Sequence, residues 1–172
     1  MKEIINSQAD NHNNYSIEEI IKQNIENNVK IRPMKREDVK LVYELSARCF
    51  AVPWTEASLI KELDNHLAHY YVAELRGNIV GYGGMWMIAG EGEITNIAVD
   101  EEYRGEGIGQ AIVNHLMQVG QEKTLCMIHL EVRSSNEIAQ RLYVGAGFEK
   151  ITVRKGYYQK PTEDAIVMIY QY

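Results

Sequence analysis

The chain has 172 residues, of which 45% are hydrophobic and 24% charged, and its 18 basic and 24 acidic side chains give a net charge of −6. This composition is typical of one globular domain with its own core, and the acidic balance argues against a nucleic-acid binder, which needs a cationic surface. No run approaches about 18 apolar residues and Met1–Asp10 lack a secretory signal, so we expect no membrane span and a cytoplasmic protein.

The first 30 residues are polar and rich in asparagine, and we interpret them as an extension of a domain at residues 31–172. Ser16 and Glu19 form a capping box ahead of a stripe of isoleucines, which predicts a short helix. About twelve residues are marginal for an isolated helix. The helix therefore either docks on the domain or on a second subunit, or it belongs to a frayed tail.

The first part of the domain contains signals for both helices and strands. Thr55 and Ser58 can cap a helix, and the turn Arg76-Gly77-Asn78 between two alternating apolar runs indicates a hairpin. Glycines inside the second of these strands suggest a close approach or a bulge. In order, we expect a strand at 29–32, a helix from 37 to about 50, a helix from 55 to about 65, and strands at 70–75 and 79–88.

The central stretch, residues 96–111, passes from a strand through a glycine-rich turn into a helix. Gly105, Gly107 and Gly109 let backbone N–H groups converge at the start of that helix, where they are unpaired and carry the positive end of the dipole. This arrangement predicts a phosphate cradle. The spacing fits neither the dinucleotide fingerprint nor the Walker loop, because the glycines alternate and no Lys follows Gly109.

The remaining pattern completes the expected fold. A strand at 125–132 should lie beside the strand that precedes the cradle, and Ser135 or Asn136 can cap a helix that stops at Gly145 to Gly147. A last hairpin pairs 151–158 with 165–172. The order β-α-α-β-β-β-α-β-α-β-β predicts an α/β (α+β) fold with a central, mixed, mostly antiparallel sheet and helices on both faces.

Glu131 is the first candidate for chemistry. Strand alternation places it on one face with His129 and Arg133, beside the predicted cradle. One interpretation is a solvated face or an ion pair with Arg133. The other is a general base or a residue that holds a water near the reacting end of a ligand bound at that cradle.

Other residues have both a structural and a functional interpretation. Tyr143 is either a core aromatic or a proton donor to a leaving group, and Asn136 is a helix cap that could also contact a ligand. Pro53-Trp54 is a turn with a core Trp, and Tyr157-Tyr158 is either cross-strand packing or an aromatic wall for a peptide. The histidines and the lone Cys49 and Cys126 show no metal-ligand spacing, so we expect no metal.

These segments resemble the GNAT acetyltransferase superfamily and, within it, the RimI-type protein N-terminal acetyltransferases, over about residues 31–172. The glycine loop is common to the superfamily, whereas the Pro-Trp and Tyr-Tyr segments are closer to the RimI type. The resemblance rests on Cys49 to Thr55, Asn96 to Asp100, Arg104 to Gly109, Leu130 to Asn136, Leu142-Tyr143, Gly147-Phe148, Arg154 to Tyr158, and Glu163 to Ala165.

The resemblance implies roles for individual residues. Glu131 would accept a proton, Tyr143 would donate one, and acetyl-CoA would be the cosubstrate. Two departures are the extension at 1–30 and Gly105, which stands where a larger basic residue is frequent. The implied cofactor contacts are Ile97, Ala98, Val99, Arg104, Gly105, Glu106, Gly107, Ile108, Gly109, Gln110 and Asn136, and the expected walls of an acceptor groove are Trp54, Tyr157 and Tyr158.

Three functions remain open from the sequence. The first is acetyl transfer to the N-terminal α-amine, expected to be alanine, of a protein such as small-subunit ribosomal protein eighteen. The second is acetylation of a small amine such as a polyamine, an amino acid or an antibiotic. The third is a silent acetyl-CoA-binding module, against which Glu131 and Tyr143 argue. We expect direct transfer rather than an acetyl-cysteine step, no direct nucleic-acid partner, and a monomer or weak homodimer.

Overall fold

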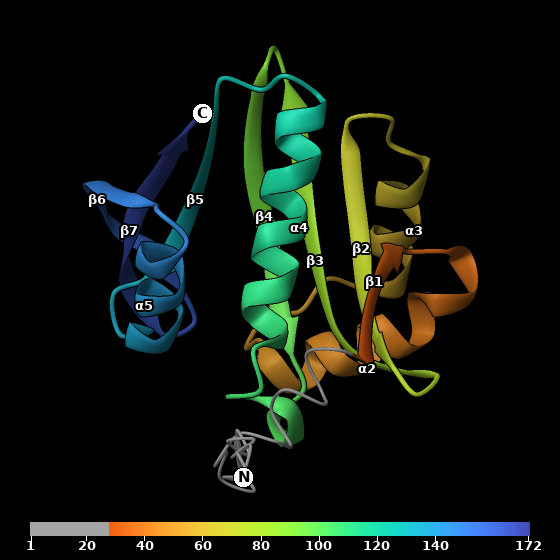
Figure 1. Cartoon of the computed structure of the whole chain (residues 1–172). Helices are drawn as coiled ribbons and strands as arrows, with labels where there is room; N and C mark the ends of the chain where they lie inside the picture. The colour runs from red at the N-terminus through yellow and green to blue at the C-terminus, as the bar shows by residue number, and fades with distance from the viewer. Residues whose placement is uncertain (1–27) are drawn as a thin grey trace, which may run out of the picture.

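The structure is a computed structural model that describes residues 28–172, so the predicted helix at Ser16 and Glu19 lies outside the described residues. The elements follow in the predicted order, with two added 3-10 turns (Figure 1). Their bounds are β1 Val29–Pro33, η1 Arg36–Asp38, α2 Val39–Cys49, α3 Glu56–Asp64, β2 Ala68–Leu75, β3 Asn78–Ile88, β4 Glu91–Val99, η2 Glu101–Tyr103, α4 Ile108–Glu122, β5 Met127–Arg133, α5 Glu137–Gly145, β6 Glu149–Gln159 and β7 Thr162–Gln171.

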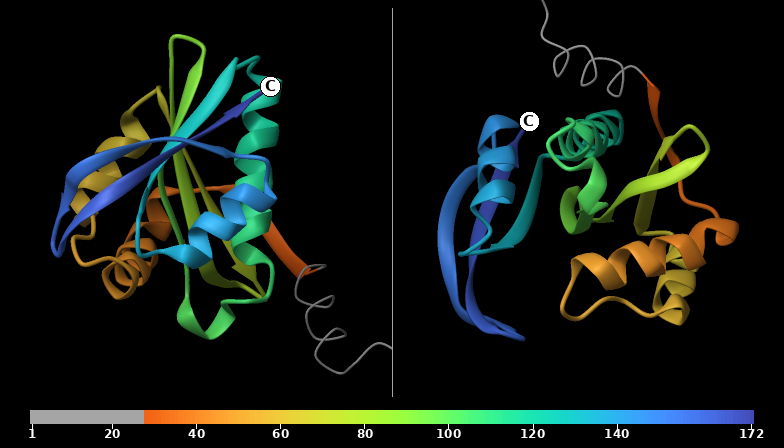
Figure 2. Two further views of the ribbon diagram at one scale, coloured as in Figure 1. Left: turned by 90° about the vertical axis from the view of Figure 1, so that its left-hand side faces the viewer. Right: turned by 90° about the horizontal axis from the view of Figure 1, so that it is seen from below.

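One seven-stranded sheet organises the domain, in the order β1-β2-β3-β4-β5-β7-β6. Every neighbouring pair is antiparallel except β4 and β5, which are parallel. Helices α4 and α5 cover one face, and α2 and α3 cover the other (Figures 1 and 2). The mixed, mostly antiparallel sheet with helices on both faces is therefore confirmed, as is the placement of β5 beside β4.

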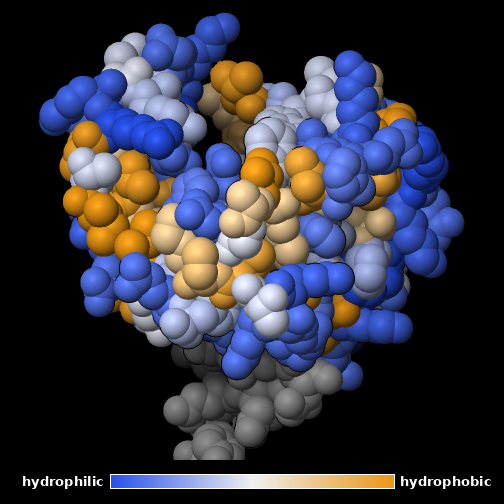
Figure 3. Space-filling view, turned by 90° about the horizontal axis from the view of Figure 1, so that it is seen from above, coloured by the Kyte–Doolittle hydropathy of each residue, from blue (hydrophilic) through white to orange (hydrophobic). Residues whose placement is uncertain are grey.

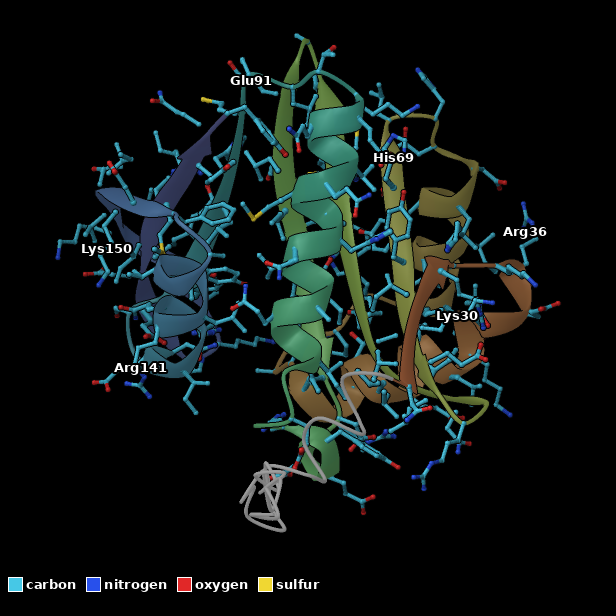
Figure 4. The ribbon with its side chains drawn as sticks, in the orientation of Figure 1. Lys30, Arg36, His69, Glu91, Arg141 and Lys150 are labelled. Carbon is cyan, nitrogen blue, oxygen red and sulfur yellow. The ribbon has the colours of Figure 1, made fainter. Side chains whose placement is uncertain are left out.

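Each face of the sheet has its own core. Helix α4 buries a stripe that includes Ile112 and Leu116 against β3, β4 and β5. On the other face, Val42 and Leu45 of α2 pack against Tyr82. Burying one such side chain contributes about 1.5–3 kcal/mol. The charged Arg36 lies on one flank, and Arg141 and Lys150 lie on the opposite flank (Figure 4).

Local signals in the sequence explain how the helices approach the sheet. The predicted cap of α3 is present, because Ser58 N donates to Thr55 Oγ1 at 3.1 Å. A Cβ on Gly83 would lie 2.5 Å from Ile112 of α4, and one on Gly84 would lie 2.3 Å from the Tyr70 ring on the other face. Glycine at these two positions therefore lets both layers pack closely against β3.

Strands β4 and β5 separate after a short pairing. Their register runs only from Glu91↔Met127 to Ile94↔Leu130, although each strand keeps its antiparallel neighbour beyond that point. The sheet therefore splays between β4 and β5, with the edge of β4 from Thr95 to Val99 left unpaired on that side. In residues 28–172, no helix has the length and apolarity needed to cross a membrane.

Candidate active site

A cavity of about 490 Å³ lies where β4 and β5 separate. In the view from above, the surface is hollowed between the β6–β7 part and the rest of the molecule (Figure 3). The cavity brings together several residues that the sequence singled out. Its lining includes Ile97 of β4, Glu131 of β5, Asn136 and Tyr143 of the α5 region, Tyr157 and Tyr158 of β6, Cys49 at the end of α2, and residues 50–52 of the connection between α2 and α3.

Glu131 is a buried carboxylate with a cationic partner. Its side chain is only 8% exposed, and Oε1 lies 2.6 Å from Nη1 of Arg154 on β6. Arg133 instead binds Glu163 and covers the Tyr158 ring at 4.1 Å. The interpretation of Glu131 as a solvated residue or a partner of Arg133 is therefore wrong, because β6 places a different arginine over it. Within the described chain, Oε2 accepts no hydrogen bond.

Tyr143 is both a core residue and part of the cavity wall. Its ring packs against Phe148 with centroids 5.9 Å apart, and the side chain lines the cavity. Its hydroxyl makes no hydrogen bond to any residue in 28–172. Burial raises the pKa of Tyr143 well above its ordinary value, so this hydroxyl stays protonated at physiological pH. A protonated, unpaired hydroxyl in a cavity can donate to a ligand atom.

The start of α4 has the geometry of an anion cradle. Gly105 and Gly107 adopt φ values of +86° and +79°, which favour glycine, and Gly107 caps the helix without a side-chain hydrogen bond. The first helical hydrogen bond is donated by Ala111 to Gly107. The N–H groups of Ile108, Gly109 and Gln110 thus have no acceptor in the described part of the chain, and they fit an anionic ligand such as a pyrophosphate.

Comparison with known proteins shows the family of the chain. The model of the acetyltransferase (GNAT) family matches residues 39–148. The chain belongs to the GNAT family.

Close relatives of this GNAT acetyltransferase are named for one reaction. A Bacillus subtilis (strain 168) protein, named a putative ribosomal protein bS18-alanine N-acetyltransferase, is 41% identical over 80% of this chain and 92% of its own length. The Escherichia coli (strain K12) ribosomal protein bS18-alanine N-acetyltransferase is 30% identical over 80% of this chain and 94% of its own length. A crystal structure of the S18-alanine enzyme from Escherichia coli has a TM-score of 0.77, with 28% identity, over 83% of this chain and 93% of that one.

Other expected cofactor residues of the GNAT domain surround the splay. Asn136 caps α5 as predicted, with Ala139 N donating to its Oδ1 at 3.1 Å, and it also lines the cavity. Ala98 is buried toward α2, so only its backbone faces the open edge. Arg104 turns back toward β4, where Nε donates to the carbonyl of Val99 at 3.2 Å and Nη2 lies 3.7 Å from Cys49 Sγ. Glu106 belongs to the turn before α4.

The three expected acceptor-groove residues lie in two different places. Tyr157 and Tyr158 line the cavity, and the Tyr158 hydroxyl donates to the backbone carbonyl of Glu131 at 3.1 Å. Burial raises the pKa of Tyr158 to about 12. Trp54 instead packs against Tyr70 and Trp86, at 6.1 and 6.4 Å between ring centroids, and does not line the cavity. The structure therefore places it against the core on the face of the sheet that carries α2 and α3.

Sequence reasoning missed several residues at the site. Phe50 and Val52 line the cavity in place of Trp54, because the turn after α2 faces β5. Glu163 joins the β6–β7 turn to the start of α5: Ser135 N donates to its Oε1 at 2.5 Å, and Arg133 Nη1 donates to its Oε2 at 3.0 Å. Arg154 could not be assigned to Glu131 from sequence, because the register of β6 shifts twice against β7.

Proposed function

We propose that this GNAT acetyltransferase transfers the acetyl group of acetyl-CoA to the N-terminal α-amine of an alanine-first protein, with ribosomal protein bS18 as the candidate acceptor. The observation that carries the proposal is the buried carboxylate of Glu131, with one oxygen free, in a cavity that also holds the Tyr143 hydroxyl. The named activities of the relatives from Bacillus subtilis and Escherichia coli support this choice of acceptor.

Unpaired backbone groups of the cradle and of the splay are the proposed contacts of the cofactor. The N–H groups of Ile108, Gly109 and Gln110 would hold the pyrophosphate, and the free edge of β4 at Ile97 and Val99 would hold the pantetheine arm. Asn136 would contribute from the start of α5. Acetyl-CoA, when bound, supplies the acetyl group as an activated thioester.

Glu131 is the proposed general base. An α-ammonium has a pKa of about 7.7–8.0, so a carboxylate can remove its proton at neutral pH, either directly or through one water. Arg154 holds Oε1 and keeps the carboxylate in place, which leaves Oε2 for the acceptor. General-base catalysis of this kind contributes roughly 10²- to 10⁴-fold in rate.

Tyr143 is the proposed general acid. Its hydroxyl remains protonated because burial raises its pKa, and it has no competing acceptor in the described residues. It donates its proton to the sulfur that leaves when the acetyl group is transferred. Glu131 and Tyr143 then exchange protons with water, which returns the site to its starting state.

The test of this function is acetyl transfer to a panel of short peptides that differ in their first residue, with spermidine and free amino acids as competing acceptors. We expect transfer to the α-amine of an Ala-first peptide that begins like bS18, and none to the same peptide with a blocked amine. Transfer to spermidine or amino acids alone would replace the protein acceptor with a small amine.

The first variant to measure is Glu131→Gln. We expect kcat on the Ala-first peptide to fall about 10²- to 10⁴-fold, because the amide cannot accept the proton, while the Kd for acetyl-CoA stays within about twofold. Glu137→Gln is the matched control, since Glu137 is 78% exposed on α5 and its partner is Arg141. Equal kcat values and pH–rate profiles in wild type and Glu131→Gln would remove Glu131 from the reaction.

A further inference from the structure

Asn96 stands out among the polar side chains that line the cavity. In residues 28–172, three buried side-chain atoms have no hydrogen-bond partner: Asn96 Oδ1, His115 Nε2 and His129 Nδ1. Of the three residues, Asn96 alone lines the cavity. A buried carbonyl oxygen without a donor is unfavourable, so its position on a cavity wall points to a ligand that supplies an N–H.

Asn96 lies two residues past the end of the β4–β5 pairing, and the sheet register fixes which way it faces. Asn96 is directly opposite Gly84 on β3, and a Cβ on Gly84 would meet the Tyr70 ring on the face that carries α2 and α3. Paired residues project to the same face of a sheet. Asn96 therefore projects away from α4 and α5.

Glu131 projects to the same face. His129, two residues earlier on β5, lies 3.7 Å from Glu93 of β4, and Glu93 is opposite Trp86, whose indole donates to Glu62 of α3 at 2.6 Å. Strand alternation places Glu131 on the side of His129. Asn96 and Glu131 thus lie on one face, on the two strands that separate.

Asn96 and the cradle lie on opposite faces of the sheet, which separates the site of the acceptor from the site of the cofactor. The unpaired amides of the cradle belong to α4, on the opposite face of the sheet (Figure 2). The neighbouring Thr95 hydroxyl is already engaged by Tyr70 and by the carbonyl of Gly84, so it does not satisfy Asn96. The ligand that reaches Asn96 therefore enters from the side of α2 and α3.

We propose that Asn96 binds the acceptor's α-amine, with Oδ1 accepting one of its N–H groups while Glu131 Oε2 takes the proton that leaves. The inference rests on the proposed function and adds a second contact at the same nitrogen. Of the three protons of the α-ammonium, one moves to the Glu131 carboxylate, one passes to water as the amide forms, and the one that is bonded to Asn96 stays on nitrogen. The contacts to Asn96 and Glu131 hold the nitrogen in place beside the thioester.

The test compares Asn96→Ala and Asn96→Asp with wild type, using an Ala-first peptide and its twin that carries propionyl in place of alanine and so lacks only the amine. A hydrogen bond from a charged amine corresponds to about ten- to hundredfold in affinity. We expect Asn96→Ala to weaken the Ala-first peptide by that factor and to change the propionyl twin less than twofold. Asn96→Asp, which keeps an acceptor, should bind the Ala-first peptide within about threefold of wild type.

The Kd for acetyl-CoA and the melting temperature separate a binding role from a structural one. Both should match those of Asn78→Ala, a control at the exposed first residue of β3. Asn96→Leu, with a similar shape and no acceptor, replaces Asn96→Ala if the latter does not fold. Equal losses for both peptides, or a weaker Kd for acetyl-CoA alone, would overturn the inference.

The inference and the proposed function fail in different ways. Peptide acetylation by wild type, together with unchanged peptide affinity in Asn96→Ala, would refute the role of Asn96 alone. Acetylation of spermidine and of no peptide would refute the proposed function. In that case the Michaelis constant for spermidine is compared between wild type and Asn96→Ala, and an unchanged value would overturn the role of Asn96 as well.

Discussion

Tyr143 has a ring that packs in the core and a side chain that lines the cavity, and the proposed function makes its hydroxyl the proton donor. We expect Tyr143→Phe to lower kcat on an Ala-first peptide about 10²-fold or more, with the free energy of unfolding within about 1 kcal/mol of wild type. The ring still packs on Phe148, and the deleted hydroxyl has no protein partner within residues 28–172. Steady-state kinetics and urea unfolding measure the two effects.

The pH dependence gives a second check on Tyr143. Since burial raises its pKa, the acid form persists above the ordinary tyrosine range, and wild-type kcat should show no loss from this group up to about pH 10. If Tyr143→Phe had the same kcat as wild type, water rather than Tyr143 would protonate the sulfur.

Arg154 is expected to stabilise the fold through Glu131. Arg154→Met leaves a carboxylate that is 8% exposed without its cation, and we expect the free energy of unfolding to fall by about 1–3 kcal/mol. The matched control is Arg141→Met, which removes the exposed i,i+4 pair with Glu137 on the outer flank and should cost about 0.5 kcal/mol or less (Figure 4). Equal losses in both variants would show that burial of Glu131 does not matter.

At the scale of elements, Glu163 connects two segments that border the cavity, the β6–β7 hairpin and the start of α5. It accepts hydrogen bonds from Ser135 and Ser134 before α5 and from Arg133 of β5, while its own residue belongs to β7. The backbone hydrogen bond from Ser135 is the main reason that the pKa of Glu163 falls to about 2, from its ordinary 4.5. This residue thereby fixes the β6–β7 hairpin, whose strand β6 carries Tyr158, to the start of α5.

The lowered pKa predicts how stability depends on pH. A carboxylate with a depressed pKa contributes its full stabilisation above its unfolded value of about 4.5, and that contribution is lost as pH falls toward about 2. Glu163→Gln should therefore be less stable than wild type at pH 7, and the difference should shrink between about pH 4.5 and 2. Urea unfolding at several pH values measures this. A difference that stays constant with pH would contradict the role of the charge.

At the scale of the whole molecule, patterns among neighbouring residues were enough to predict the helices and strands. The contacts within the site depend instead on how distant strands and helices pair and pack. The caps at Thr55 and Asn136 need only neighbouring residues, and the cradle follows from glycines at fixed spacing. The partner of Glu131 depends on bulges in β6, and the place of Trp54 depends on how α3 packs over β3. Neither contact leaves a periodic signal in the sequence. The sequence therefore offered Arg133 as the ion-pair partner of Glu131 and Trp54 as a wall of the acceptor groove.

The splay between β4 and β5 predicts a response of the whole domain to its cosubstrate. A ligand that binds only the folded state at about one hundred times its Kd stabilises it by about 2.7 kcal/mol, which for a domain of this size raises Tm by roughly 5–11 °C. We expect acetyl-CoA to produce such a shift in thermal unfolding, because it would fill the unpaired edge of β4 and the cradle of α4 together.

Adenosine 3′,5′-bisphosphate is the control for that shift, because it carries neither the pyrophosphate nor the pantetheine arm and should raise Tm by less than half as much at the same concentration. Hydrogen exchange locates the contacts: the amides of Ile108, Gly109 and Gln110, which have no acceptor in the described chain, should become protected only with acetyl-CoA. A full shift without protection of these amides would place the cofactor away from α4, and it would mean that the splay, rather than the cradle, supplies most of the binding.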